Sequence, residues 1–543
     1  MIRWLGVLGF VVFGAGTGAF AWVNSSWWWA LAVPVFAIGL VGVHDLVQQQ
    51  HSILRNYPVL GHTRFAMESI RPEIQQYFVE RNTDGAPFDR ETRGLVYARA
   101  KGEEDARPFG TERNVNSIGY EFVTHSLLAK TAEGAIPSVT IGGPQCTQPY
   151  EMALMNVSAM SFGSLSANAI EALNAGAAMG GFLHDTGEGA ISPYHLKHGG
   201  DLNWEIASGY FGCRTSDGQF DPDQFEQKAR GETVKTISVK LSQGAKPGLG
   251  GVLPGAKVTE EIARTRGVEL GKTVISPPAH TAFANPLELI EFIEQLRDLS
   301  GGKPVGIKLC VGSRHEFLAI CKAMLDRESY PDFIIVDGSE GGTGAGPVEF
   351  SDHMGMPLTE GLVFVHNALT GIGVRQHVKI GASGKVASGI DVVKRICQGA
   401  DFTLSARAMM FALGCIQAQV CHTNRCPVGV ATQDPRRARA LDVSVKSKRV
   451  RNFQTQTVAS AHQIVTSMGL ASFAELHPGL LNRRIEHQIT QTYAELHEWL
   501  SPGQLLDAPP ADWVNDWDLA DPMDFGRRIS NRPPGFHPTL FQD

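Results

Sequence analysis

Three cysteines near residue 420 are the strongest chemical signal in the sequence. Cys415, Cys421 and Cys426 fall within twelve residues, and Pro427 follows the last of them. A chain of 543 residues does not need disulfides to fold, so clustered thiols indicate a metal site. Three thiolates suit an iron–sulfur cluster, whereas a structural zinc site needs a fourth ligand, which His422 could supply. The residues favour the cluster and leave zinc and free thiols open.

Two lysines stand inside apolar, strand-like runs further upstream. Lys240 lies in the run 236–241, and Lys308 lies in the run 305–310. A buried ammonium without an anion is costly, so each lysine predicts a nearby anion, such as a cofactor or a carboxylate substrate. The alternative is that both side chains point outward between helices and keep their charge in water.

A repeated strand–helix pattern must position these residues. Short apolar runs end in Gly, Ser or Lys, and helical periodicity follows them at 167–180, 286–299, 314–325 and 387–398. Eight runs predict a (β/α)8 TIM barrel, an α/β fold, with a doubly wound open sheet as the alternative. The predicted strands are 155–161, 181–185, 236–241, 273–276, 305–310, 333–337, 378–381 and 402–405.

The loops after the seventh and eighth predicted strands indicate a phosphate site. TIM barrels commonly bind phosphate there, with backbone N–H groups and the next helix N-terminus facing the anion. Small residues permit that close approach. The loop residues are Ser383 and Gly384 after strand seven, and Ser405, Ala406 and Arg407 after strand eight.

Two uncharged apolar runs at the N-terminus predict a transmembrane hairpin. Residues 4–23 and 27–43 each approach the roughly 20 residues that span a bilayer. Arg3 precedes the first run and Arg55 and Arg64 follow the second, so the positive-inside rule places both ends in the cytoplasm. We expect an inner-membrane protein with a cytoplasmic catalytic domain. A signal peptide or a buried helical pair is the alternative.

The composition indicates a globular protein, and the sequence divides into four segments. Charged residues make up 19% and the net charge is 48 − 55 = −7, which excludes wholesale disorder and disfavours nucleic-acid binding. We expect a hairpin at 1–48, an extension at 49–125, the barrel with its cysteines at 126–440, and a helical segment with a tail at 441–543. Within the segment 441–543, the apolar pattern predicts an amphipathic helix at 482–500.

Several long motifs resemble one family. The stretch 237–255, ISVKLSQGAKPGLGGVLPG, is similar to the central FMN-domain signature of glutamate synthases. Further segments in the same order also resemble that family. They are MSFGSLS at 160–166, TGEG at 186–189, VISPPAH at 274–280, GGTGA at 341–345 and CHTNRCPVGVATQ at 421–433.

The resemblance implies an FMN-binding barrel that carries a [3Fe-4S] cluster. In the family, 2-oxoglutarate and ammonia form 2-iminoglutarate, which reduced FMN converts to L-glutamate. Lys240, Gln243, Lys246 and Arg266 would then hold the 2-oxo acid, the first three as catalytic residues. Lys308 would lie near the flavin ring. The other implied ligands are Ala159, Met160, Ser161, Gly342, Ser383, Gly384, Ser405, Ala406 and Arg407 for FMN, and Cys415, Cys421 and Cys426 for the cluster.

The departures from the family shape the functional hypotheses. We expect no glutamine hydrolysis, because a hairpin stands where the family has its glutaminase domain. We expect an external electron donor, either a ferredoxin or a reductase subunit, because no NADPH or FAD domain is recognised. Val252 stands where the family has Gln. The first hypothesis is therefore reductive amination of 2-oxoglutarate. The alternatives are another amine or oxo acid, as in N-methylglutamate formation, and a non-catalytic membrane electron-transfer or scaffold subunit.

Overall fold

The computed structural model describes residues 2–134 and 136–526. The chain divides into two compact units, Met1–Arg90 and Glu91–Asp543. The apolar N-terminal runs belong to the first unit. Every candidate site residue belongs to the second.

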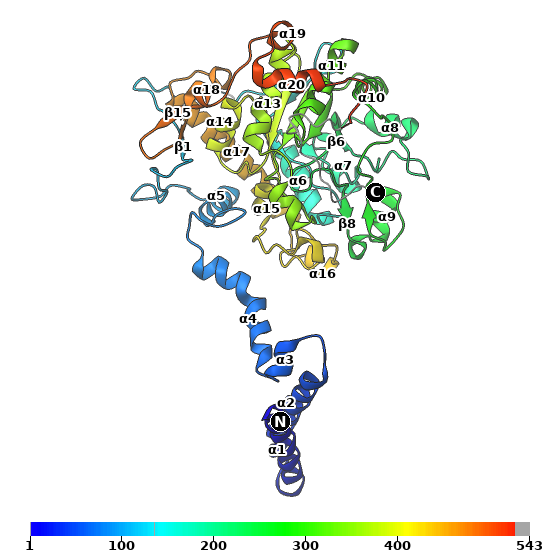
Figure 1. Cartoon of the computed structure of the whole chain (residues 1–543), viewed down its shortest axis with the longest axis vertical. Coiled ribbons are helices and arrows are strands. Elements are labelled where there is room, and N and C mark those ends of the chain that lie inside the picture. The colour runs from blue at the N-terminus through cyan, green and yellow to red at the C-terminus, as the bar shows by residue number, and fades with distance from the viewer. Residues whose placement is uncertain (1, 135, 527–543) are drawn as a thin grey trace, which may run out of the picture. The chain divides into compact units, whose positions relative to one another are not determined.

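Eight parallel strands of the second unit close into a barrel, which confirms the predicted TIM-barrel fold. The barrel strands are β4 (Met155–Val157), β5 (His184–Asp185), β6 (Leu202–Ile206), β7 (Val234–Lys240), β10 (Val305–Leu309), β11 (Phe333–Asp337), β12 (Lys379–Ser383) and β13 (Phe402–Ser405). The barrel closes where β13 aligns Leu404 with Asn156 of β4. An open doubly wound sheet is thereby excluded. Figure 1 shows the barrel strand β6 among the helices of this unit.

One of the eight predicted strands is wrong. The run 273–276 forms β9 (Val274–Ile275), which pairs antiparallel with β8 (Val252–Leu253) outside the barrel. The third barrel strand is instead β6, which a search for apolar runs misses because it carries Asn203 and Glu205. Both polar side chains are buried: Asn203 donates a hydrogen bond to Asp185 of the neighbouring β5, and Glu205 accepts one from Lys308 of β10, so this strand is interior without being apolar.

Four helices between strands match their predicted positions closely. They are α6 (Ala167–Gly180), α10 (Pro286–Leu299), α11 (Arg314–Arg327) and α14 (Gly389–Cys397). Ser166 caps α6 by accepting a hydrogen bond from Ala169 N at 3.2 Å, and Asn285 caps α10 in the same manner. The other helices of this unit include α7 (Pro193–Leu196), α8 (Pro222–Ala229), α9 (Glu260–Arg266), α12 (Val348–His353), α13 (Leu358–Gly371), α15 (Arg407–Leu413) and α16 (Pro435–Ala438).

A hairpin seals the end of the barrel opposite the strand C-termini. It consists of β2 (Val139–Ile141) and β3 (Tyr150–Met152). Ile141 and Met152 pack against Phe333 and Phe402, which begin β11 and β13. The strand C-termini are therefore the open end, where TIM barrels place their sites.

The C-terminal segment is only partly helical. Helix α17 (Val443–Ser467) packs against α6, α14 and α15. The predicted helix at 482–500 is wrong, because β14 (Leu481–Arg484) pairs there with β1 (Glu121–Val123) on one side and with β15 (Thr490–Thr492) on the other. Strand pairing with a distant segment overrides the local helical pattern. The helices that follow are α18 (Tyr493–Leu496), α19 (Gln504–Asp507) and α20 (Ala511–Leu519).

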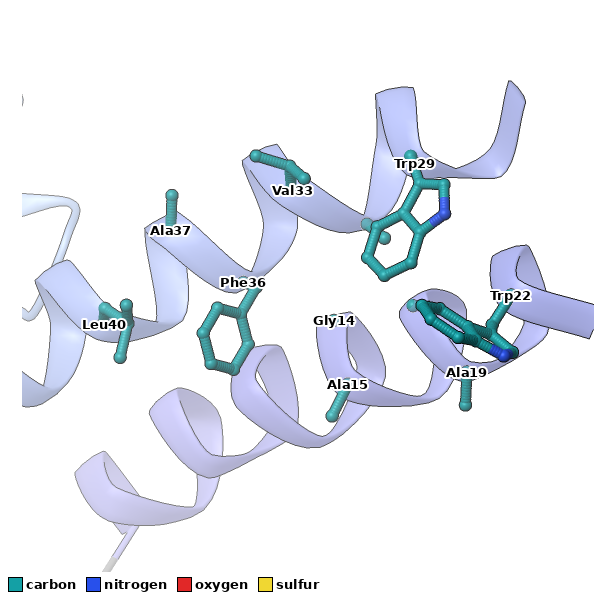
Figure 2. A pocket seen from close by; sticks show the side chains of 11 residues that line it. Gly14, Ala15, Ala19, Trp22, Trp29, Val33, Phe36, Ala37 and Leu40 are labelled. Carbon is teal, nitrogen blue, oxygen red and sulfur yellow. The ribbon is translucent and has the colours of Figure 1, made fainter. Parts of the chain in front are cut away.

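The first unit begins with the predicted helical hairpin. Helix α1 (Ile2–Asn24) and helix α2 (Trp29–Val47) are joined by a short turn, η1 (Ser26–Trp28). The helices touch through glycine, because a Cβ on Gly14 would lie 2.8 Å from the backbone nitrogen of Phe36. Figure 2 shows the apolar groove beside this contact, with Trp22 and Trp29 lining it. Both helices are long and apolar enough to cross a membrane.

A buried aspartate fixes the corner after the hairpin. Asp45 accepts hydrogen bonds from the backbone nitrogen of Val59 and from His62 Nε2, both at 2.9 Å. The contact ties the end of α2 to the segment that contains α3 (Ser52–Asn56) and α4 (Gly61–Ile74). The π-helical turn η2 (Gln75–Val79) follows α4, and α5 (Arg90–Lys101) begins where the first unit ends.

Two helical glycines provide a matched test of the packing of α17 on the barrel. A Cβ on Gly176 of α6 would lie 2.7 Å from Val450 Cβ and 2.8 Å from the carbonyl oxygen of Ser447, whereas a Cβ on Gly94 of α5 meets nothing within 4 Å. We expect Gly176→Ala to lower the free energy of unfolding by about 1–3 kcal/mol through overpacking. Gly94→Ala should raise it by about 0.5–1 kcal/mol. Chemical unfolding in detergent measures both, and equal effects would contradict the close approach of α6 and α17.

Candidate active site and cysteine cavity

The open end of the barrel contains a network of buried opposite charges. Lys308 Nζ donates to Glu205 Oε2 at 2.9 Å, and Lys240 Nζ donates to Glu188 Oε2 at 2.8 Å and to Gln243 Oε1 at 2.6 Å. The second oxygen of Glu205 lies 3.8 Å from Lys240 Nζ. Glu205 therefore bridges the two lysines. Both lysines point into the barrel mouth, and the outward-facing alternative is excluded.

Burial and ion pairing set the protonation of this network. Burial alone would lower the pKa of Lys308, but the carboxylates of Glu205 and Asp337 raise it above its ordinary value. Burial would raise the pKa of Glu188, but Lys240 brings it down to about 2. For Asp185, burial and the neighbouring charge of Glu205 raise the pKa to about 7. Burial and the charge of Glu205 therefore disfavour the ionised form of Asp185.

Lys246 differs from the other two lysines because its charge is not paired. Its side chain is 3% exposed, yet no hydrogen bond or ion pair joins Nζ to any residue that the structure describes. Burial lowers its pKa, and the charge of Glu188 opposes that effect only in part. The preceding Ala245 adopts a left-handed backbone with φ of 65°, an uncommon conformation for a residue with a side chain. A buried, unpartnered ammonium indicates an anionic or carbonyl ligand.

The loop that carries Gln243 and Lys246 is held by a close backbone contact. Gly244 N donates to Asp337 Oδ2 at 2.9 Å, and a Cβ on Gly244 would lie 1.9 Å from the carbonyl oxygen of Gly338. Only glycine fits there. The loops after β7 and β11 are thereby fixed against one another, and the position of Lys246 is set by both.

Arg266 ends helix α9 and reaches the loop after β4. Its Nη2 donates to Ser161 Oγ at 3.1 Å and to the carbonyl oxygen of Phe162 at 2.8 Å. Burial lowers its pKa to about 10, and the charge of Glu188 favours its charged form. The guanidinium lies over the ring of Phe211, 5.3 Å from its centroid. Arg266 thus shares the electrostatic environment of Glu188 with the lysines.

The predicted phosphate loops come together at the ends of β12, β13 and β4. Ser383 Oγ lies 3.3 Å from Ser158 Oγ, and Ser405 Oγ donates to the carbonyl oxygen of Val386 at 2.7 Å. Gly384 has a φ of 155°, and Ala406 precedes helix α15.

Two cationic side chains, those of Arg407 and Lys385, lie beside these loops. Burial lowers the pKa of Arg407, and burial together with the charge of Arg407 lowers the pKa of Lys385. The charge of Arg407 disfavours that of Lys385, whereas the carboxylates of Asp337 and Glu340 favour the charged form of Arg407. A phosphate beside both cations would stabilise their charged forms. Arg407 Nη2 is oriented by the carbonyl oxygen of Glu340 at 2.7 Å.

The remaining predicted cofactor residues lie on the adjoining loops. Ala159, Met160 and Ser161 follow β4, and a Cβ on Gly187 would lie 2.8 Å from Ser161 N. Gly342 packs against Arg407, because a Cβ there would lie 2.8 Å from Arg407 Cδ. These contacts place all the predicted residues around one end of the barrel.

The three clustered cysteines line a common cavity next to helix α15. Cys415, Cys421 and Cys426 all border it, and their charges would interact with one another. Burial raises the pKa of Cys415 to about 12. Within 2–134 and 136–526, no three His, Cys, Asp or Glu side chains converge on a single metal ion, and His422 is exposed. Three separated thiols around one cavity fit a multi-iron cluster better than one zinc ion.

Sequence reasoning missed three site residues for identifiable reasons. Glu205 and Asp185 stand within barrel strands, and Glu205 was overlooked because β6 is not apolar. Lys385 directly follows the phosphate loop but has no motif of its own. The spacing of Asn203 and Glu205 is the signal that could have identified β6. Residues two positions apart in a strand lie on the same face, so two polar side chains at this spacing can both point into the barrel.

Comparison with known proteins gives a family model and several relatives. The model described as the conserved region in glutamate synthase matches residues 130–471. The glutamate synthase large subunit-like protein YerD of Bacillus subtilis is 36% identical over 515 residues, which cover 87% of this chain and 97% of that protein.

Two further relatives match over shorter parts of their own length. The archaeal-type glutamate synthase [NADPH] of Thermotoga neapolitana is 32% identical over 319 residues, which cover 59% of this chain and 60% of that protein. The glutamate synthase [NADPH] large chain of Azospirillum brasilense is 34% identical over 459 residues, which cover 82% of this chain and 28% of that protein.

The bridging carboxylate can be tested by a matched pair of substitutions. Glu205→Gln leaves the buried ammonium of Lys308 without its carboxylate, so we expect a loss of about 3–5 kcal/mol in the free energy of unfolding. Glu226→Gln breaks an exposed pair with Arg230 and should cost about 1 kcal/mol or less. Denaturant unfolding followed by tryptophan fluorescence compares the two. Equal losses would show that Glu205 does not neutralise Lys308.

Proposed function

The chain belongs to the glutamate synthase family, and from this premise we propose that it is a glutamate-synthase-like oxidoreductase that reductively aminates 2-oxoglutarate to L-glutamate with FMN and a [3Fe-4S] cluster. The observation that carries the proposal is Lys246, a buried ammonium at the barrel mouth with no partner among the described residues. Lys240, Lys308 and Arg266 surround the same opening, so an acid with two carboxylates suits it.

The phosphate loops and Lys308 support FMN as the cofactor. Ser383, Gly384, Ser405 and Ala406 offer small side chains and backbone N–H groups. Arg407 and Lys385 supply positive charge for a phosphate. FMN, when bound, supplies the hydride for reduction of the substrate imine. Lys308, held by Glu205, keeps a fixed positive charge inside the mouth, where it favours a reduced, anionic ring.

The substrate would be held by the cations that face Glu188. Arg266 can orient a carboxylate through its planar fork, and Lys240 adds a second positive charge. Lys246 has a pKa below its ordinary value and can donate a proton to the oxo oxygen when it leaves as water. Glu188 competes with the substrate for Lys240 until the acid enters.

The cysteine cavity supports a [3Fe-4S] cluster as the second redox group. Its three thiols would each ligate one iron, and no fourth Cys or His borders the cavity in the part of the chain that the structure describes. Electrons would come from an external donor, a ferredoxin or a reductase subunit. Free ammonia or a partner glutaminase would supply the nitrogen.

The apolar hairpin supports location at the inner (cytoplasmic) membrane. Large apolar side chains on α1 and α2 face outward, including Trp22 with 82% of its surface exposed, and a lipid environment would cover them. Arg55 and Arg64 follow the hairpin, and by the positive-inside rule they support a catalytic unit on the cytoplasmic side.

Val252 supports a second candidate, the same chemistry with a different amine or 2-oxo acid, as in N-methylglutamate formation. It begins β8 next to Gly251, where a Cβ would lie 1.7 Å from Glu188 Oε1. It is therefore Gly251 that packs against Glu188, and Val252 beside it offers no hydrogen-bonding amide where the family has Gln. The pocket would therefore accept a more apolar group than ammonia.

Lys246 provides the direct test of the reaction. In the reduced full-length protein, 2-oxoglutarate with ammonia should reoxidise the flavin, and Lys246→Met should slow this by about 100-fold or more. FMN content should be unchanged. Lys272→Met, at an exposed lysine, is the control. Stopped-flow absorbance measures the rate. Reoxidation only with methylamine would favour the second candidate, and full activity of Lys246→Met would refute the role of Lys246.

Membrane insertion predicts resistance to alkaline extraction. The full chain should stay in the membrane pellet after carbonate treatment, because two apolar helices hold it there. Val12→Asp combined with Val33→Asp should release it, since each charge costs about 2.5–3.5 kcal/mol at a helix centre. Leu127→Asp, at an exposed position of the second unit, is the control. Immunoblots of pellet and supernatant give the result, and wild-type protein in the supernatant would exclude the anchor.

A further inference from the structure

The loop after β4 is held by side chains from three distant segments. Four successive backbone carbonyls of this loop, those of residues 162–165, each accept a hydrogen bond from such a side chain. Arg266 Nη2 donates to Phe162 O at 2.8 Å, and Lys257 Nζ donates to Ser164 O at 2.9 Å. Gln433 Nε2 donates to the carbonyls of 163 and 165 at 2.9 and 2.7 Å. The loop therefore joins the substrate-facing Arg266 to the cysteine segment.

Lys257 is the unusual member of this group. It is 3% exposed, and no carboxylate within 2–134 or 136–526 forms an ion pair with it. Three of the other buried lysines have partners among the described residues, whereas Lys246 lies at the barrel mouth with none. Lys240 and Lys308 pair with carboxylates, and Lys303 binds two carbonyls at the end of α8. The ammonium of Lys257 requires an anion from another source.

The cysteine segment is that source. Burial lowers the pKa of Lys257 to about 8, and the charges of Cys421 and Cys426 oppose that shift. The two segments are also tied by their backbones, because Asn424 Nδ2 donates to the carbonyl oxygen of Ala256 at 3.2 Å. Gln433 N in turn donates to Asn424 Oδ1 at 2.7 Å. Lys257 is thus fixed beside two of the three thiols that line the cavity.

We propose that Lys257 is a positioning residue whose buried positive charge sets the reduction potential of the iron–sulfur cluster held by Cys415, Cys421 and Cys426. The inference rests on the proposed cluster. Reduction adds one negative charge to the cavity, and a fixed cation at short range in a low-dielectric interior favours the more negative state. Lys257 therefore raises the potential, so that the cluster accepts an electron more readily.

The loop supplies an uncharged control for the test. Lys257→Gln removes the charge but keeps a donor for the carbonyl of Ser164, whereas Gln433→Leu removes two contacts to the same loop and no charge. Lys257→Arg keeps the charge. The measurement is an EPR-monitored redox titration of the full-length, detergent-purified protein, with iron assayed on each sample.

A charge effect and a packing effect give different results. At a fixed potential, Lys257→Gln should lower the ratio of reduced to oxidised cluster at least tenfold, which corresponds to about 59 mV for a one-electron couple. Gln433→Leu and Lys257→Arg should stay within about threefold of wild type. Loss of the cluster in Lys257→Gln alone, with retention in the other two, also supports the role of the charge.

Three outcomes would overturn the inference. An unchanged potential in iron-loaded Lys257→Gln refutes it and leaves the proposed function intact. An equal shift or equal iron loss in Gln433→Leu would assign the effect to displacement of the loop. Wild-type protein that contains no iron would reject the cluster itself and the inference with it.

Discussion

The burial of ammonium groups in the barrel mouth is the constraint on which the site depends. A buried lysine inside a barrel needs an anion at short range. Glu205 provides that anion for both Lys308 and Lys240. This requirement explains why β6 carries a glutamate in its interior. It also explains why Lys246 is distinctive, since Glu188 already pairs with Lys240 and leaves Lys246 to a ligand.

The loops at the open end of the barrel are held rigidly because their backbones pack directly against one another. Gly244 lies against Gly338, and Gly187 lies against Ser161, at distances that admit no side chain. Such contacts hold Lys246 in place despite the left-handed conformation of Ala245. The side chains of the barrel mouth lose their conformational freedom when the protein folds. A ligand then binds to groups that do not have to rearrange.

The same principle extends from the mouth to the cysteine segment. The carbonyls of the loop after β4 accept hydrogen bonds from side chains of both regions, so the barrel mouth and the cysteine segment share one structural element. The hairpin belongs to the first unit. Residues 4–43 carry no charged side chain, and both helices are long and apolar enough to cross a membrane.

The sequence by itself determined the barrel, seven of its eight strands, the hairpin and the cysteine cluster, because local periodicity and motif spacing encode them. It did not determine β6, whose buried Glu205 is stabilised only by lysines distant in the chain. It also misassigned 482–500, where pairing with β1 decides the outcome. The partners of Lys257 lie some 100 residues before it and 160 residues after it, so only the tertiary structure could bring its charge to the thiols.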